Sequence, residues 1–175
     1  AAILAELGAA WTVRVHPAGT LAVFWHTGKW SARAGRSADF GDHYHGAIAV
    51  PLVNRATGQG LDVIATHTRP KSVATPAQKI TDVRKAFSLR GTWPAVWVGD
   101  WAMDADEHAA AAGLVRVSPD ADTMDAAGDH HVDAIYVTKG GRVALRKSSL
   151  VDPGQVSDHR WVLGQLTVTA PTPTA

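Results

Sequence analysis

Short apolar runs bounded by turn residues constrain the fold of this chain more than any other feature. Some alternate apolar and polar residues and others are continuously apolar, and both patterns are typical of strands. The runs occupy residues 11–16, 20–26, 45–53, 61–67, 95–98, 132–138, 142–150 and 161–168. Turn formers at 54–60 predict that the third and fourth runs form an antiparallel hairpin. The turn Gly140-Gly141 predicts that 142–150 pairs with 132–138 in the same way.

Helical patterns are fewer than strand patterns. Thr75 and Pro76 form an N-cap and first-turn pair, after which apolar residues recur at helical spacing until Gly91. Shorter helices are predicted at residues 1–7 and 104–112, and a surface loop at 35–45. Because strands outnumber helices and two helices interrupt them, we expect an α+β layered sandwich with mixed sheets.

Composition excludes several classes of protein. With 46% hydrophobic and 19% charged residues, we expect one globular domain over 1–168, followed by a Pro/Thr tail or linker at 169–175. No apolar run approaches the roughly 20 residues that cross a bilayer. A net charge of +1 disfavours indiscriminate nucleic-acid binding, and the absence of cysteine excludes disulfides, thiolate zinc sites and a cysteine nucleophile. The chain starts at Ala1, so we expect a processed or partial polypeptide.

Residues that can carry chemistry stand at the ends of four apolar runs. His67 and Asp100 end two of them, Asp133 begins a third, and Asp158 and His159 directly precede the last. Burying such groups separately and without partners would be costly. We therefore expect them to share one site at an edge of the sandwich.

Four segments in order, ATHT, VGDW, HHVDAIYV and VSDHRWVLGQL, resemble motifs of the endonuclease/exonuclease/phosphatase superfamily. This superfamily includes deoxyribonuclease I-like nucleases, exonuclease III-like repair enzymes, sphingomyelinases and inositol phosphate phosphatases. The resemblance covers about residues 1–168, and Ser-Asp-His before the last strand is its most specific element. It implies a four-layer α/β/β/α sandwich that lacks the first strands, and Mg²⁺- or Mn²⁺-assisted hydrolysis of phosphate esters.

The resemblance also implies a role for each residue. Asp100 matches the carboxylate that positions or deprotonates the attacking water, and Asp158 matches a carboxylate close to the metal, so both are predicted metal ligands. His159 matches the catalytic histidine, and Asp133 the acid that orients its ring. His67 matches the histidine that contacts the scissile phosphate.

The sequence departs from the family pattern at three points. The family's metal-binding Glu and a phosphate-contacting Asn belong to a segment that precedes the region matched here. Ala102 stands where the family has an Asn, and Gly19 stands where deoxyribonucleases have a Glu that pairs with the counterpart of His67. Without the Glu, Asp100 and Asp158 would bind Mg²⁺ weakly.

Two further residues are predicted to bind substrate. Arg69 lies just beyond His67, where a phosphate would approach, and Trp101 is next to Asp100, where it would line a cleft. A transition-metal site is the weaker hypothesis for the histidines His43, His45, His130 and His131, because their spacing matches no zinc-protease motif. Glu6 is interpreted as part of a solvated helix face. The acidic segment 104–108 is interpreted as the cap of a helix.

Two functions from different classes remain open. The first is a divalent-metal-dependent phosphodiester hydrolase, nuclease-like, for which the weight of the family favours DNA as substrate. The near-neutral charge leaves phospholipid head groups and small phosphoesters open as other substrates. The second is a catalytically degenerate sandwich that serves as a structural or binding module of a larger assembly, such as a multidomain or virion-associated protein. Ala102 and Gly19 favour the second, and the ordered set of polar strand ends favours the first.

Overall fold

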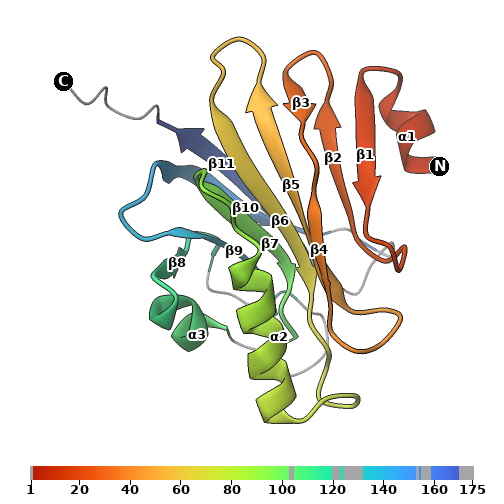
Figure 1. Ribbon diagram of the computed structural model, residues 1–175, viewed down its shortest axis with the longest axis vertical. Helices are drawn as coiled ribbons and strands as arrows, with labels where there is room; N and C mark the ends of the chain where they lie inside the picture. Colours follow the sequence, from red (N-terminus) through yellow and green to blue (C-terminus); the bar gives the residue numbers. More distant parts are fainter. Residues whose placement is uncertain are drawn as a thin grey trace.

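A mixed sheet of seven strands forms the centre of the computed structural model, which describes residues 2–102, 105–119, 123, 132–152, 154 and 159–169 (Figure 1). The strands are β3 (Trp30–Ala32), β4 (Arg36–Asp39), β5 (Gly46–Asn54), β6 (Gly60–His67), β7 (Ala95–Asp100), β8 (Leu114–Arg116) and β9 (Asp133–Thr138). Their order is β3-β5-β6-β7-β9-β8, with β4 also paired to β5. Only β6 and β7 are parallel among these described pairs, and the predicted β5–β6 hairpin is confirmed.

Helix α2 (Pro76–Ser88) carries the chain from β6 to β7 and covers one face of the sheet (Figure 1). Its start follows the sequence prediction: Thr75 accepts the N–H of Gln78, whose side chain accepts the N–H of Thr75. The buried side chains of Val83 and Phe87 pack on the sheet beside helix α3 (Asp106–Ala111), so the apolar stripe of α2 forms the core on this face.

Two antiparallel hairpins cover the opposite face of the sheet. Strand β1 (Trp11–Val15) pairs with β2 (Ala22–His26), and β10 (Val143–Val151) pairs with β11 (Trp161–Val168). The first hairpin packs mainly on β5 and β6, and the second packs on β7 and β9. Helix α1 (Ala2–Leu7) lies against β1 on the outside (Figure 1). The layers run helices, sheet, hairpins, helix, which is the predicted α+β sandwich.

Some local predictions are wrong. Strand β10 does not pair with β9, because β9 already has β7 on one side and β8 on the other. The predicted loop at 35–45 contains β4, and β3 and β8 have no counterpart in the sequence prediction. These strands are three or four residues long and lack a run of buried side chains, so no apolar pattern marks them.

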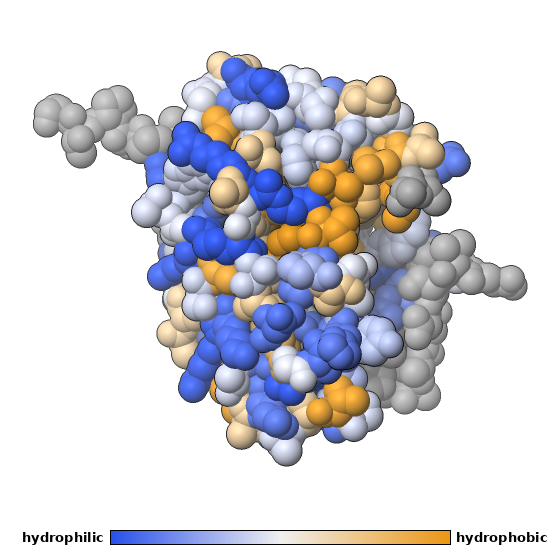
Figure 2. All heavy atoms as spheres, turned by 45° about the vertical axis from the view of Figure 1, so that its right-hand side comes forward, coloured by the Kyte–Doolittle hydropathy of each residue, from blue (hydrophilic) through white to orange (hydrophobic). Residues whose placement is uncertain are grey.

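The surface near the N-terminus carries apolar side chains. Figure 2 shows a band of hydrophobic side chains across a largely hydrophilic face. Ile3 and Leu7 of α1 and Val15 of β1 are among the exposed large apolar side chains. None of the helices in the described ranges is long and apolar enough to span a membrane.

Candidate active site

Three predicted site residues lie side by side at one end of the central sheet. His67 of β6 is opposite Asp100 of β7, and Asp100 is opposite Asp133 of β9. Side chains alternate between the two faces of a strand, and the residues two positions along each of these strands pack toward the hairpins. All three polar side chains therefore belong to the hairpin face, and the strand register sets their spacing.

Asp100 is fixed by the turn that follows β7. Its Oδ1 accepts the N–H of Ala102 at 2.6 Å, and its Oδ2 lies 3.6 Å from Nε2 of His67. Residues of other segments also stabilise the turn. Thr68 donates its N–H to the carbonyl of Asp100, and the buried Lys79 donates Nζ to the carbonyl of Ala102 at 2.6 Å. Burial lowers the pKa of Lys79. One carboxylate oxygen of Asp100 is thus committed to its own turn and the other faces His67.

Asp133 and His159 form a hydrogen-bonded acid–imidazole pair. Oδ2 of Asp133 lies 2.7 Å from Nδ1 of His159, and the N–H of Asp133 donates to Oγ1 of Thr123. Burial raises the pKa of Asp133; the hydrogen bond with His159 opposes this increase, and the charge of Asp100 adds to it. The hydrogen bond at Nδ1 fixes the orientation of the His159 ring. The structure thus brings together His67, Asp100, Asp133 and His159, as the strand-end pattern predicts.

A second acid–imidazole pair lies beside His67 and is missing from the site predicted from sequence. Nδ1 of His45 is 2.8 Å from both carboxylate oxygens of Asp42, which also accepts the N–H groups of Tyr44 and His45. The ring centroids of His45 and His67 are 4.4 Å apart, with an interplanar angle of 59°. The hairpin register is the signal that could have found this pair, because Gly46 is opposite His67.

The electrostatics of His67 reflect all of these neighbours. Burial lowers the pKa of His67, and the charge of Asp100 opposes that effect. His45 and His159 lower the pKa of His67 further, and Asp42 raises it. His67 therefore lies within electrostatic reach of both acid–imidazole pairs, which flank it and Asp100.

The two residues predicted to bind substrate, Trp101 and Arg69, both make internal contacts. Trp101 is fully buried on the helix side of the sheet, and its Nε1 donates to the carbonyl of Ala134 at 3.3 Å. It follows Asp100 directly, so the alternation of the strand turns it to the opposite face. Arg69 donates Nε and Nη2 to the fully buried Asp82 at 2.8 and 3.0 Å. The prediction that Trp101 lines a cleft is wrong, and Arg69 is engaged in an internal ion pair.

The described residues do not form a magnesium site by themselves. Within 2–102, 105–119, 123, 132–152, 154 and 159–169, no three side chains of His, Asp or Glu are grouped so as to hold a metal ion. Asp158, the second predicted ligand, lies outside these ranges, as do His130 and His131. Hard cations need several oxygen ligands. Asp100 alone does not meet this requirement.

The two departures from the family pattern have clear backbone settings. Gly19 has a φ of 81° in the turn between β1 and β2, where a side chain would meet no other atom within 4 Å. Ala102 has a φ of 48°, a left-handed conformation that Asn adopts more readily than Ala. Gly19 supplies no carboxylate to His67. Among the residues that the structure describes, Asp100 provides the carboxylate that lies next to His67.

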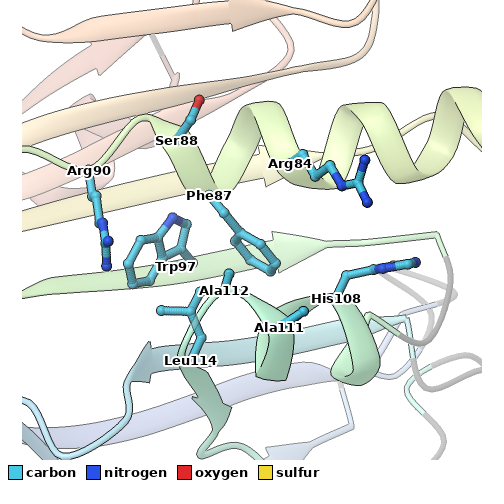
Figure 3. A pocket seen from close by; sticks show the side chains of 9 residues that line it. All are labelled: Arg84, Phe87, Ser88, Arg90, Trp97, His108, Ala111, Ala112 and Leu114. Atoms are coloured by element: carbon cyan, nitrogen blue, oxygen red, sulfur yellow. The ribbon is translucent and has the colours of Figure 1, made fainter.

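A cavity of about 340 Å³ opens beside the acid–imidazole pair on the hairpin face. Asp133 and His159 lie in its wall, and Leu21 and Trp161 belong to its lining. A different pocket, of about 430 Å³, lies between α2 and α3 on the helix face (Figure 3). Arg84 and His108 face its opening from the two helices, and none of the site residues lines it. Of these two cavities, the first is the one that reaches the strand ends, because Asp133 and His159 line it.

Comparison with known proteins shows similarity in structure rather than in sequence. The sequence matches no protein-family profile and no curated protein. The chain is similar to the human Nocturnin catalytic domain with bound sulfate anion, with a TM-score of 0.77 and 15% identity, over 96% of this chain and 75% of that one. It is also similar to the mannosyl-6-phosphatase Bt3783 of Bacteroides thetaiotaomicron, with a TM-score of 0.69 and 12% identity, over 93% and 79% of the two chains. A third similar structure is D. rerio TDP2 complexed with single strand DNA product, with a TM-score of 0.67 and 11% identity, over 84% and 72%. At such identities the comparison shows a shared fold.

Proposed function

The chain has the fold of the endonuclease/exonuclease/phosphatase superfamily, and we propose that it is a hydrolase of phosphate esters that acts on the phosphodiesters of DNA. The observation that carries the proposal is the row of His67, Asp100 and Asp133 on three adjacent strands, with His159 bonded to Asp133. Polar strand ends with purely local roles would find partners within their own loops. Here the groups face one another across strands, as the parts of a catalytic site do.

Each side chain has a role that its geometry supports. Water attacks the phosphorus, and Oδ2 of Asp100 takes up a proton from the water. The bond from phosphorus to the leaving oxygen breaks, and that oxygen receives a proton from Nε2 of His159, whose ring Asp133 orients through Nδ1. His67, whose side chain is 36% exposed beside Asp100, donates an N–H to a phosphoryl oxygen and stabilises the charge that develops there.

We include a requirement for Mg²⁺ or Mn²⁺ in this proposal. Asp100 and Asp158 would hold the ion, which when bound would supply positive charge to the phosphoryl oxygens. The described residues provide only the first of these carboxylates, so no step above depends on the ion. Removal of divalent ions with EDTA, followed by addition of Mg²⁺ or Mn²⁺, tests the requirement directly. Full activity in EDTA would remove the metal from the proposal.

DNA is proposed as substrate because a similar fold, that of TDP2, is known in complex with a single strand DNA product. A mannosyl-6-phosphatase has a similar fold too, so a small phosphomonoester is the natural competitor. The net charge of +1 agrees with a site that binds one phosphate group closely, rather than with a surface that binds a long duplex through many contacts.

The experiment compares hydrolysis of plasmid DNA, bis(p-nitrophenyl) phosphate and p-nitrophenyl phosphate by the wild type, Asp100→Ala and His159→Ala. Loss of a general acid or base is expected to reduce the rate by about 100-fold or more. His43→Gln is the matched control, because His43 is an exposed histidine with no part in the proposed site. Equal rates in the wild type and both alanine variants would refute the roles. No hydrolysis by the wild type with either metal would refute the function.

A catalytically inactive binding module is the second candidate. Ala102 favours it, because its methyl group cannot hold a phosphate. Such a module would retard DNA or a phosphate-bearing partner in a gel without cleaving it. The plasmid assay separates the candidates, because cleavage that depends on Asp100 and His159 occurs only if the chain is an enzyme.

A further inference from the structure

The Asp42–His45 pair is built like the Asp133–His159 pair and lies on the other side of His67. In both pairs a carboxylate oxygen is within 2.8 Å of Nδ1 of the imidazole. Burial acts to raise the pKa of Asp42, but the N–H groups of Tyr44 and His45 and the ring of His45 outweigh it, so the pKa of Asp42 is lowered. Asp42 is thus an ionised carboxylate whose two oxygens are turned to one imidazole.

His45 has one unused polar atom next to the proposed phosphate site. Its Nδ1 is engaged by Asp42, which leaves Nε2, and Nε2 has no hydrogen-bond partner among the residues the structure describes. The side chain of His45 is 11% exposed. It packs at 4.4 Å between centroids on His67, whose Nε2 lies 3.6 Å from Asp100. An oxyanion that bonds to His67 is therefore within reach of His45.

We propose that His45, held by Asp42, is a second ligand of the phosphoryl group that His67 contacts, so that the site binds phosphate through a pair of imidazoles. This inference rests on the proposed function in taking the strand-end row as a phosphate site. A phosphate oxygen that bonds at Nε2 meets an N–H there, so the ring in the complex carries an N–H at both nitrogens. The ionised Asp42 stabilises the imidazolium that forms, through a charge-assisted hydrogen bond at Nδ1.

Burial of His67 explains why a second imidazole is useful at this position. Burial and the neighbouring histidines lower the pKa of His67, against the opposing charge of Asp100, and so disfavour a positive charge on this ring. The carboxylates of Asp100 and Asp133 add negative charge to the same row. A phosphate that approaches this row needs a positive group, and the ring of His45, hydrogen-bonded to Asp42, can provide one.

The test is a titration of inorganic phosphate into the metal-free wild type, followed by long-range ¹H–¹⁵N NMR spectra of the histidine rings. We expect the Nε2 signal of His45 to move from that of a bare nitrogen to that of an N–H as phosphate saturates the site. Loss of one charge-assisted hydrogen bond in His45→Gln should raise the Kd for phosphate by about 10- to 100-fold. His43→Gln, two residues away and exposed, should bind as the wild type does.

Asp42→Asn is the second variant and tests the positioning role of Asp42. Its amide oxygen still accepts the N–H groups of Tyr44 and His45, so the loop keeps its hydrogen bonds, but the negative charge is lost. A higher Kd for phosphate in Asp42→Asn supports the proposal, even if His45→Gln fails to fold. An unchanged Kd in Asp42→Asn, an unchanged Kd in a folded His45→Gln, or no change at the His45 ring in the wild type overturns it. Phosphate binding through His45 in a chain that hydrolyses no ester would refute the proposed function and leave this inference standing.

Discussion

Replacement of Gly99 by Ala should damage the site and the fold together. Gly99 precedes Asp100 in β7, has a φ of 144°, and passes so close to β6 that an added Cβ would stand 1.9 Å from the carbonyl oxygen of Thr66. Real Cβ atoms essentially never come closer than 3.0 Å to another heavy atom, so the two strands would have to separate by about 1 Å. Gly99 is therefore what allows His67 and Asp100 to face each other in register.

The size of the effect follows from two costs. A non-glycine residue in this backbone region costs about 1–3 kcal/mol, and forced overpacking in a closely packed sheet costs about 1–3 kcal/mol more. Gly99→Ala should therefore lower the free energy of unfolding by about 2–6 kcal/mol. Urea unfolding followed by the fluorescence of the seven tryptophans measures this change.

Gly58→Ala is the matched control for this prediction. Gly58 also has a positive φ, of 68°, but an added Cβ there would meet nothing within 4 Å. Gly58→Ala should lower the free energy of unfolding by about 1 kcal/mol, which is the cost of placing a non-glycine residue at a positive φ, and should leave hydrolysis unchanged. If Gly99→Ala is within about 0.5 kcal/mol of Gly58→Ala, the close approach of β6 and β7 is not what requires a glycine, and the reasoning is refuted.

Three more predictions concern individual side chains. Arg69→Met should lower the free energy of unfolding by about 3–5 kcal/mol, because it leaves the buried Asp82 unpaired. The double variant Arg69→Met/Asp82→Leu should recover most of the lost stability. A raised KM in an Arg69→Met variant that is still folded would instead support the prediction that Arg69 binds substrate. Asp133→Asn should reduce hydrolysis by about 100-fold or more, since the amide orients His159 less well. The pKa of Asp133 in the folded protein lies above its ordinary value of 3.8. The free energy of unfolding of the wild type should therefore fall as the pH rises from 3.8 through the raised pKa. Asp133→Asn cannot titrate, so its free energy of unfolding should not show this fall when unfolding is measured over the same pH range. Ala102→Asn should raise stability by about 0.5 kcal/mol in urea unfolding, because Asn adopts the left-handed conformation at lower cost, and a lower stability would contradict this account of Ala102.

The sequence predicted those elements that leave a local signature. The capping pair at Thr75, the β5–β6 hairpin and the strand that ends at Asp100 all depend on residues close together in the chain, and all are present. The pairing of β10 was mispredicted because a glycine turn favours a local hairpin, whereas the choice of partner was made by β7 and β8, which occupy both edges of β9. Strand β4 is four residues long and mostly exposed, so its sequence has no apolar alternation that would predict a strand.

Within the site, the sequence supplied the residue types and the fold supplied their neighbours. His67, Asp100, Asp133 and His159 could be selected because polar residues at the ends of apolar strands are conspicuous. Trp101 could not be assigned by proximity in the chain, since consecutive residues of a strand point to opposite faces. Asp42 and His45 lie in a loop, and only the register of the hairpin brings their pair against His67.

What the amino-acid order determined alone is therefore the longer strands, helix α2 and the residue types at the strand ends, because short-range sterics, capping and hydrophobic periodicity act over a few residues. What the tertiary structure decided is which of those strands are neighbours, which side chains are exposed, and which carboxylate each imidazole meets. These depend on contacts between segments far apart in the chain, where the burial of apolar faces against one another fixes the register and the register then places each polar group.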